Sequence, residues 1–209
     1  MFDQFKPKAA MAKANYETLA LALRQQLLQL QFTLEDSRHP VIIVIAGLDG
    51  SGKGVLVHRL NEWMDPRGID TNTYWEHSDE EESRPYFWRY WQKLPPRGRM
   101  GIFLGSWYTD ATHKRLDGSI DAGQLEQACH RINTFERQLS ADGAIIIKLW
   151  LHVSEETQSR QLKEKAPRKQ QNPRVTEHPY ELEGKYTQTL AIAQELIRPD
   201  GLKFHFETV

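Results

Sequence analysis

The feature that most constrains the fold is a continuous apolar run at residues 41–46 (VIIVIA), followed directly by a glycine-rich segment. A β-branched run of this length is typical of a parallel strand that is buried on both faces. The next segment, residues 47–54 (GLDGSGKG), fits the pattern G-x-x-x-x-G-K and leads into a helical stretch at residues 55–64. A strand, a glycine-rich turn and a helix in this order predict a phosphate-binding loop.

The residue types of this loop indicate how it would bind phosphate. Glycines let the backbone wrap closely around a phosphate group, and the start of a helix presents free N–H groups to an anion. We expect these contacts at Gly47, Gly50, Ser51, Gly52, Lys53 and Gly54. The alternative is an ordinary glycine-rich turn before a helix, which the flanking strand and helix make the weaker interpretation.

One position departs from the general motif. Gly54 stands where a serine or threonine usually binds Mg²⁺. Asp49, inside the loop, is a candidate replacement ligand, because an acidic side chain beside bound phosphate is unfavourable unless a cation lies between them. The alternative role for Asp49 is to stabilise the turn.

Strands and helices alternate along the chain. The pattern predicts helices at residues 8–32, 55–64, 80–93, 122–139 and 180–197. It predicts strands at residues 41–46, 71–75, 101–104, 144–152 and 203–208, and a charged loop at residues 163–174. Such alternation implies a mostly parallel sheet with helices on both faces. We therefore predict a three-layer α/β domain over residues 41–209, preceded by a leader helix and connection at residues 1–40.

Composition excludes several classes of protein. The 27 basic and 28 acidic residues give a formal charge of −1, so we expect no general affinity for DNA, RNA or anionic membranes. The single Cys129 excludes an intramolecular disulfide and a multi-cysteine zinc site. The first residues, MFDQFKPKAA, contain no apolar signal-peptide core. We expect a cytoplasmic protein.

Several further motifs accompany the loop in a fixed order. They are DPRG at 65–68, SDEE at 78–81, WRY at 88–90, SWY at 106–108, NTFERQL at 133–139 and KLWLH at 148–152. Together with the loop variant G-x-D-x-x-G-K-G, they make the chain resemble the polyphosphate kinase 2 family over residues 20–209. The resemblance implies a thymidylate-kinase-like P-loop kinase fold with a lid. It also implies phosphoryl transfer between inorganic polyphosphate and a nucleotide, Mg²⁺ dependence and oligomeric assembly.

The resemblance also implies roles for individual residues. Asp49 would help to hold Mg²⁺, Lys53 would neutralise phosphate charge, and Arg89, in a matched motif, would contact the transferring group. The family's lid falls around residues 163–175, where the candidate polyphosphate contacts are Lys165, Arg168, Lys169 and Arg174. A solvated charged loop is the alternative interpretation of that segment.

The chain departs from the family pattern in one small region. Leu104 and Gly105 stand where the family carries Asp-Arg before Ser-Trp-Tyr, and Thr109 and Asp110 stand where it usually has Asn and Arg. A missing carboxylate and missing arginines would slow phosphoryl transfer. The chain thus resembles the degenerate N-terminal domain of a two-domain polyphosphate:AMP phosphotransferase, which would work as a homo-oligomer or beside a fused second copy.

Three functions are consistent with these residues. The first is Mg²⁺-dependent transfer from polyphosphate to AMP, forming ADP, by this protein or by a longer protein of which it is a domain. The second is a catalytically weak module that binds polyphosphate or supports an active second domain. The third, an ATP-dependent nucleoside monophosphate kinase, is disfavoured by Gly54 and by the missing carboxylate at the end of the third strand.

Overall fold

The computed structural model describes residues 11–74, 77–171, 185–196 and 205–208. Five parallel strands form one sheet in the order β2-β3-β1-β4-β5. Their bounds are β1 (Val41–Gly47), β2 (Ile69–Thr73), β3 (Met100–Leu104), β4 (Ile145–His152) and β5 (His205–Thr208). The predicted parallel α/β architecture is confirmed.

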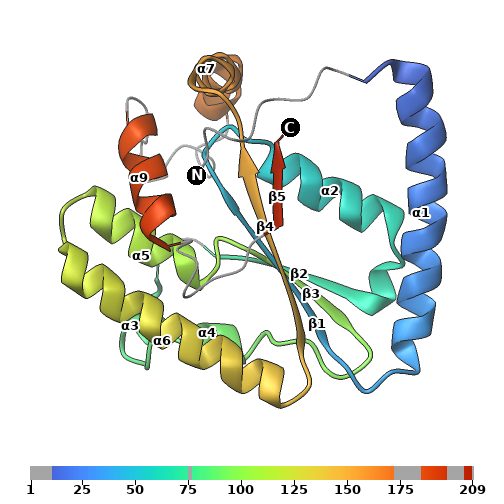
Figure 1. The fold of residues 1–209 in the computed structure, drawn as a ribbon, viewed down its shortest axis with the longest axis horizontal. Helices are drawn as coiled ribbons and strands as arrows, with labels where there is room; N and C mark the ends of the chain where they lie inside the picture. The colour runs from blue at the N-terminus through green and yellow to red at the C-terminus, as the bar shows by residue number, and fades with distance from the viewer. Residues whose placement is uncertain (1–10, 75–76, 172–184, 197–204, 209) are drawn as a thin grey trace.

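Helices cover both faces of the sheet (Figure 1). The helices α1 (Lys13–Glu35) and α2 (Lys53–Trp63) lie on one side, and α5 (Trp107–Leu116), α6 (Ala122–Ala141) and α9 (Tyr186–Leu196) lie on the other. The remaining elements are α3 (Asp79–Glu82), α4 (Trp88–Trp91), α7 (Glu155–Gln171) and the 3₁₀ helix η2 (Pro66–Gly68).

The central strand β1 is the core of the molecule, because its residues 41–46 are all buried. Alternate side chains of β1 point to opposite faces, so it contributes to two apolar clusters. Ile43 and Ile45 pack with Leu34 of α1 and Met64, whereas Val44 packs with the aromatic residues on the α6 side. This double burial explains why the run contains no polar residue.

The helix predicted at residues 80–93 is wrong as a single element. The structure has two four-residue helices there, α3 and α4, separated by Pro85. Proline lacks an N–H and fixes its backbone angle, so the first helix ends before it. The aromatic side chains after the break pack into the core: Phe87 stacks on Phe135 with ring centroids 4.3 Å apart.

The charged loop predicted at residues 163–174 is also wrong over most of its length. The backbone of α7 is helical through Gln171. Its composition of Glu, Gln, Lys and Arg has high helix propensity, which outweighs the hydrogen bond lost at Pro167. Residues 172–175 of the predicted lid, which include Arg174, lie outside the described residues.

Helix α5 has no counterpart among the predicted elements. Its sequence, WYTDATHKRL, shows no clear apolar period. It forms because Trp107, Tyr108 and Ala111 are buried by the neighbouring elements. Among the described helices, none combines the length and the apolar character needed to cross a lipid bilayer.

Candidate phosphate-binding site

The glycine-rich loop connects β1 to α2 at the carboxyl edge of the sheet. β1 lies between β3 and β4, and all three strands run parallel. The segments that follow these strands therefore open at the same edge, where ligands of open α/β sheets usually bind. The predicted strand–loop–helix arrangement is confirmed.

Three glycines give the loop a backbone that other residues rarely adopt. Gly47, Gly50 and Gly52 have φ angles of 137°, 76° and 91°. A Cβ on Gly47 would lie 2.2 Å from the carbonyl oxygen of Leu151 on β4, so glycine is also required there for space. Gly52 is the N-cap of α2, which starts at Lys53, so free backbone N–H groups of the first helical turn adjoin the loop.

The side chain of Lys53 lies along its own loop. Its Nζ donates hydrogen bonds to the carbonyl oxygens of Gly47 at 2.6 Å and Leu48 at 3.3 Å. It also forms an ion pair with Asp49 Oδ1 at 3.2 Å. The lysine and the carboxylate are 24% and 34% exposed, so both charges reach solvent at the edge of the sheet.

Two features of the loop were not anticipated from the sequence. Gln158 of α7 is buried, and its Nε2 donates a hydrogen bond of 2.9 Å to the carbonyl oxygen of Asp49. Ser51 is 1% exposed, and its hydroxyl has no hydrogen-bond partner in the part of the chain that the structure describes. A glutamine in a helix usually lies at the surface, so the sequence around Gln158 did not predict the contact between α7 and the loop.

The donor set of the loop is compatible with Mg²⁺. This ion is usually held by one or two carboxylates together with substrate phosphates and water. The described residues contain no group of three His, Cys, Asp or Glu side chains placed to bind a metal. Asp49 would supply one hard oxygen ligand, and the buried hydroxyl of Ser51 is a second oxygen in the same loop. The set fits an ion held mostly by phosphate oxygens.

The end of β3 offers no such ligand. Leu104 packs partly buried against the apolar cluster on the α2 side. Gly105 has a φ of 71°, and a Cβ there would lie 2.2 Å from the carbonyl oxygen of Tyr74. The backbone of this chain therefore leaves no space for an arginine at position 105 without movement of β2 or β3.

Arg89 is buried among aromatic rings. Its Nε lies 3.1 Å from Glu81 Oε1, and its guanidinium lies over the rings of Tyr74 and Tyr90, at 5.0 and 5.8 Å from their centroids. Burial alone would raise the pKa of Glu81, but the N–H of Ser78 and the charge of Arg89 outweigh it and lower that pKa. Contact between Arg89 and substrate stays a prediction.

Asp110 lies in the first turn of α5, next to the end of β3. It pairs with Lys114 at 3.0 Å and lies 3.7 Å from His77 Nε2. It also lines a cavity of about 280 Å³ together with Tyr86 and Arg131. Negative charge therefore stands where the resemblance implies an arginine.

The candidate lid residues divide between described and undescribed segments. Lys165, Arg168 and Lys169 belong to the last turns of α7, and Arg174 lies outside the described residues. A role for these four residues in binding polyphosphate stays a prediction.

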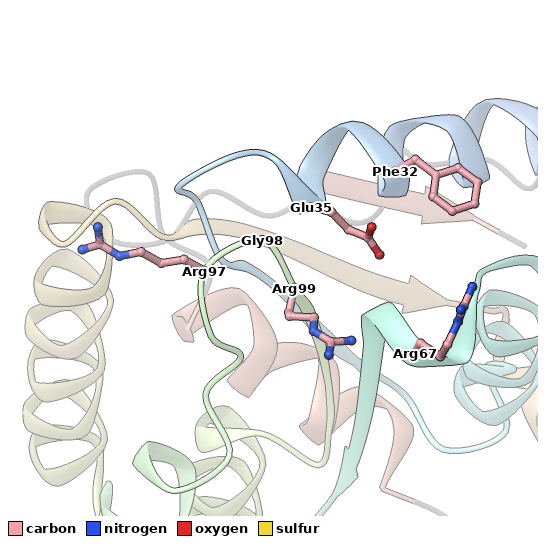
Figure 2. Close-up of a pocket in the computed structure, with 6 residues that line it drawn as sticks. All are labelled: Phe32, Glu35, Arg67, Arg97, Gly98 and Arg99. Carbon is pink, nitrogen blue, oxygen red and sulfur yellow. The ribbon is translucent and has the colours of Figure 1, made fainter.

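A larger cavity lies at the opposite edge of the sheet (Figure 2). It measures about 350 Å³ and is lined by Phe32, Glu35, Arg67, Arg97, Gly98 and Arg99. Its charges are largely balanced: Asp65 binds Arg67 at 2.6 Å, Asp142 lies 3.7 Å from Arg97, and Glu35 also faces the cavity. We do not assign this cavity to the phosphate site, because the loop opens at the other edge.

A parallel α/β sheet with a strand, a glycine-rich loop and a lysine at the start of a helix defines the P-loop kinase-like class. The polyphosphate kinase 2 (PPK2) family model matches residues 10–198. The chain belongs to this family.

Individual relatives agree with the family assignment. The chain is 42% identical over 174 residues to a polyphosphate:AMP phosphotransferase of Pseudomonas aeruginosa, which covers 83% of this chain and 34% of the relative. It is 30% identical over 149 residues to ADP-polyphosphate phosphotransferase 2 of Rhizobium meliloti, covering 71% of this chain and 49% of the relative. The chain thus spans between a third and a half of these relatives.

The fold matches a crystal structure from Pseudomonas aeruginosa that is assigned to polyphosphate kinase 2. The TM-score is 0.83 at 36% identity, and the match covers all of this chain and 42% of that chain.

Proposed function

We propose that the protein takes part in Mg²⁺-dependent phosphoryl transfer from inorganic polyphosphate to AMP, forming ADP. The observation that carries the proposal is the complete phosphate loop: three glycines with positive φ and Lys53 at the start of α2. Relatives with 42% and 30% identity carry names that specify polyphosphate with AMP or ADP. A cytoplasmic location and work as a homo-oligomer, or beside a fused second copy, belong to the same proposal.

The backbone and the side chains of the loop would make different contacts with phosphate. Backbone N–H groups at the start of α2 would bind terminal phosphate oxygens, and Lys53 would offset their negative charge. A phosphate oxygen of AMP would attack the terminal phosphorus of polyphosphate while the bridging P–O bond breaks. The products are ADP and a polyphosphate chain shorter by one phosphate.

Asp49 and the phosphate oxygens would hold Mg²⁺. When bound, the ion would neutralise charge on the transferring phosphoryl group. Asp49 alone would repel a phosphate chain, so phosphate binding should be tighter in the presence of Mg²⁺ than in its absence.

A second candidate function is a polyphosphate-binding module with little turnover of its own. The observation that favours it is the end of β3, where Leu104 lies in the apolar cluster and Gly105 cannot be replaced by arginine without backbone movement. An intact binding loop beside an incomplete transfer site would bind phosphate and stabilise the transition state poorly.

One pair of measurements tests both candidates. Calorimetry with pyrophosphate and Mg²⁺ should show binding that Lys53→Ala weakens by about tenfold or more, because a charge-assisted contact is lost. Lys93→Ala, which removes an equally charged but exposed side chain, is the matched control. Equal binding by wild type and Lys53→Ala would reject phosphate binding by the loop.

Formation of ADP from AMP and polyphosphate then separates the two candidates. Turnover that Lys53→Ala abolishes supports the transferase. Binding that depends on Lys53 without measurable turnover supports the binding module. Turnover that is faster with ATP than with polyphosphate as donor would instead support a nucleoside monophosphate kinase.

A further inference from the structure

Three consecutive carbonyl oxygens of the phosphate loop accept hydrogen bonds from side chains. Lys53 Nζ donates to those of Gly47 and Leu48 at 2.6 and 3.3 Å. The third, that of Asp49, accepts a bond of 2.9 Å from Nε2 of Gln158, which is 5% exposed. A loop that binds an anion must turn its carbonyl oxygens away from the ligand, because their partial negative charge would repel it. Lys53 and Gln158 therefore fix the direction of these backbone groups.

The peptide between Asp49 and Gly50 is held at its carbonyl oxygen only. That oxygen accepts the bond from Gln158, whereas the N–H of Gly50 has no hydrogen-bond partner among the described residues. The peptide is trans, so its C=O and N–H groups point in opposite directions. The Gly50 N–H thus points away from α7, and Gly50 is only half-buried. An unused backbone donor in the same loop as Lys53 is suited to a phosphate oxygen.

Gln158 is itself held in place near the start of α7. Its backbone N–H donates to the carbonyl oxygen of Ser154 at 2.8 Å, and the Ser154 hydroxyl accepts from the N–H of Thr157 at 3.2 Å. The carbonyl oxygen and the Cγ of Gln158 lie 3.4 and 3.5 Å from where a Cβ on Gly50 would be. Figure 1 shows α7 at the edge of the sheet where β1 and β4 end. A buried donor on a packed helix holds its acceptor more precisely than a surface side chain would.

We propose that Gln158 is a positioning residue of the phosphate site: by holding the carbonyl oxygen of Asp49, it turns the Gly50 N–H toward bound phosphate. Gln158 does not touch the ligand and acts through the backbone of the loop. Without its donor, the freedom of glycine would let the peptide rotate, and the carbonyl oxygen would face the anion part of the time. The inference rests on the proposed function, since it requires phosphate to bind at this loop.

Backbone NMR of the wild-type protein tests the direction of the Gly50 N–H. Pyrophosphate with Mg²⁺, compared with Mg²⁺ alone, should shift the Gly50 amide proton downfield, because a charge-assisted hydrogen bond forms. The internal control is Gly143, whose N–H donates to the carbonyl oxygen of Ser140 at 3.0 Å before β4 begins, and which should not shift. A protein that binds pyrophosphate through Lys53 but leaves the Gly50 signal unshifted would overturn the inference.

The variant Gln158→Met tests the side chain, because methionine has a similar length and cannot donate a hydrogen bond. The dissociation constant for pyrophosphate with Mg²⁺ should rise by about threefold to tenfold, the usual range for one neutral hydrogen bond. The downfield shift at Gly50 should be smaller than in the wild type. Gln138→Met, at an exposed position of α6, is the matched control and should bind as the wild type does. Circular dichroism checks folding, and Gln158→Leu, also without a donor, is used if the methionine variant does not fold.

The outcomes distinguish this inference from the proposed function. If Lys53→Ala binds pyrophosphate as tightly as the wild type, the loop does not bind phosphate and both fail. If Lys53→Ala weakens binding but Gln158→Met does not, only the role of Gln158 is overturned. A Gln158 variant that loses stability but keeps the wild-type affinity and the wild-type Gly50 shift would likewise overturn it, because Gln158 would then serve packing alone.

Discussion

Gly105 has a structural role in addition to marking a departure from the family pattern. From the sequence, it is a position that lacks the family's arginine. The structure adds that its φ of 71° and the Tyr74 carbonyl oxygen, 2.2 Å from where a Cβ would lie, both require glycine. The loss of the arginine is therefore coupled to the path of the backbone between β3 and α5, and restoring the side chain alone would strain the fold.

Replacing Gly105 with alanine should destabilise the protein more than the same change at another glycine with positive φ. Gly118 has a φ of 82° and no atom within 4 Å of where its Cβ would lie, so it is the matched control. We expect Gly105→Ala to lower the free energy of unfolding by ~2–4 kcal/mol, because backbone strain and steric overlap both contribute. Gly118→Ala should lower it by ~1–2 kcal/mol, because only backbone strain contributes there. Urea unfolding measures both. Equal losses of unfolding free energy in the two variants would contradict this prediction, because they would mean that β2 and β3 move apart with little loss of stability.

At the scale of elements, one buried carboxylate connects α5, α6 and β4. Glu136 of α6 accepts hydrogen bonds from Trp107 Nε1 at 3.1 Å and from the Tyr108 hydroxyl, and forms an ion pair with Lys148 Nζ at 2.9 Å. Burial and the nearby charge of Glu136 raise the pKa of Tyr108 well above its usual value, so the phenol remains a donor. The network fixes the first turn of α5, which follows β3 at the carboxyl edge of the sheet.

Removing the charge of Glu136 should be strongly destabilising. Glu136 and Lys148 are 7% and 9% exposed, so Glu136→Gln leaves a buried ammonium group without its counter-charge, at a cost of ~3–5 kcal/mol. Adding Lys148→Met should recover part of this loss. Chemical denaturation measures both variants.

The control is Asp142→Asn, at the exposed pair with Arg97, which should change stability by less than ~1 kcal/mol. A small effect of Glu136→Gln, similar to that of the control, would contradict the role of the buried pair.

At the scale of the whole molecule, two segments that follow neighbouring parallel strands lie at the same edge of the sheet. The loop after β1 carries the glycines and the lysine that are predicted to bind phosphate, whereas the segment after β3 presents Leu104 and Gly105. Helix α7 lies against the loop through Gln158, so its basic last turns extend from the same edge of the sheet. The molecule has the fold of the polyphosphate kinase 2 family, but positions 104 and 105 at the end of β3 supply no carboxylate.

A carboxylate at position 104 should increase turnover. We expect Leu104→Asp to raise Mg²⁺-dependent formation of ADP from AMP and polyphosphate by about tenfold or more, because a second carboxylate, besides Asp49, would stand next to the loop. Stability should fall by ~1–3 kcal/mol, because a partly buried leucine is lost. A coupled assay for ADP measures the gain.

Leu104→Asn is the matched control, since it has nearly the same shape without the charge. Equal activity of the Asp and Asn variants would contradict a metal-binding role for this position. If Leu104→Asp is folded but its activity is unchanged, other departures from the family sequence pattern, such as Asp110, limit the rate.

The strand, the turn and the helix start of the phosphate loop could be predicted from the sequence, because each depends on residues that are close together in the chain. The β-branched run at residues 41–46 specifies a buried strand, the glycines after it specify a turn with positive φ, and α2 begins at Lys53 as the motif requires. These predictions succeed because burial on both faces of a strand and the freedom of glycine act within a few residues.

Tertiary structure decided what depends on distant neighbours. Helix α5 has no clear period of its own and forms because its aromatic residues are buried, and Gln158 reaches the loop only because α7 packs beside it. Glu136 and Lys148 belong to two separate sequence motifs, and the sequence alone does not show that these two residues form an ion pair. The need for glycine at position 105 comes from the carbonyl oxygen of Tyr74, the residue that follows the neighbouring strand β2. The sequence by itself therefore determined the phosphate loop, and the packing of separate segments decided what surrounds it, because burial and close approach between strands are not local properties.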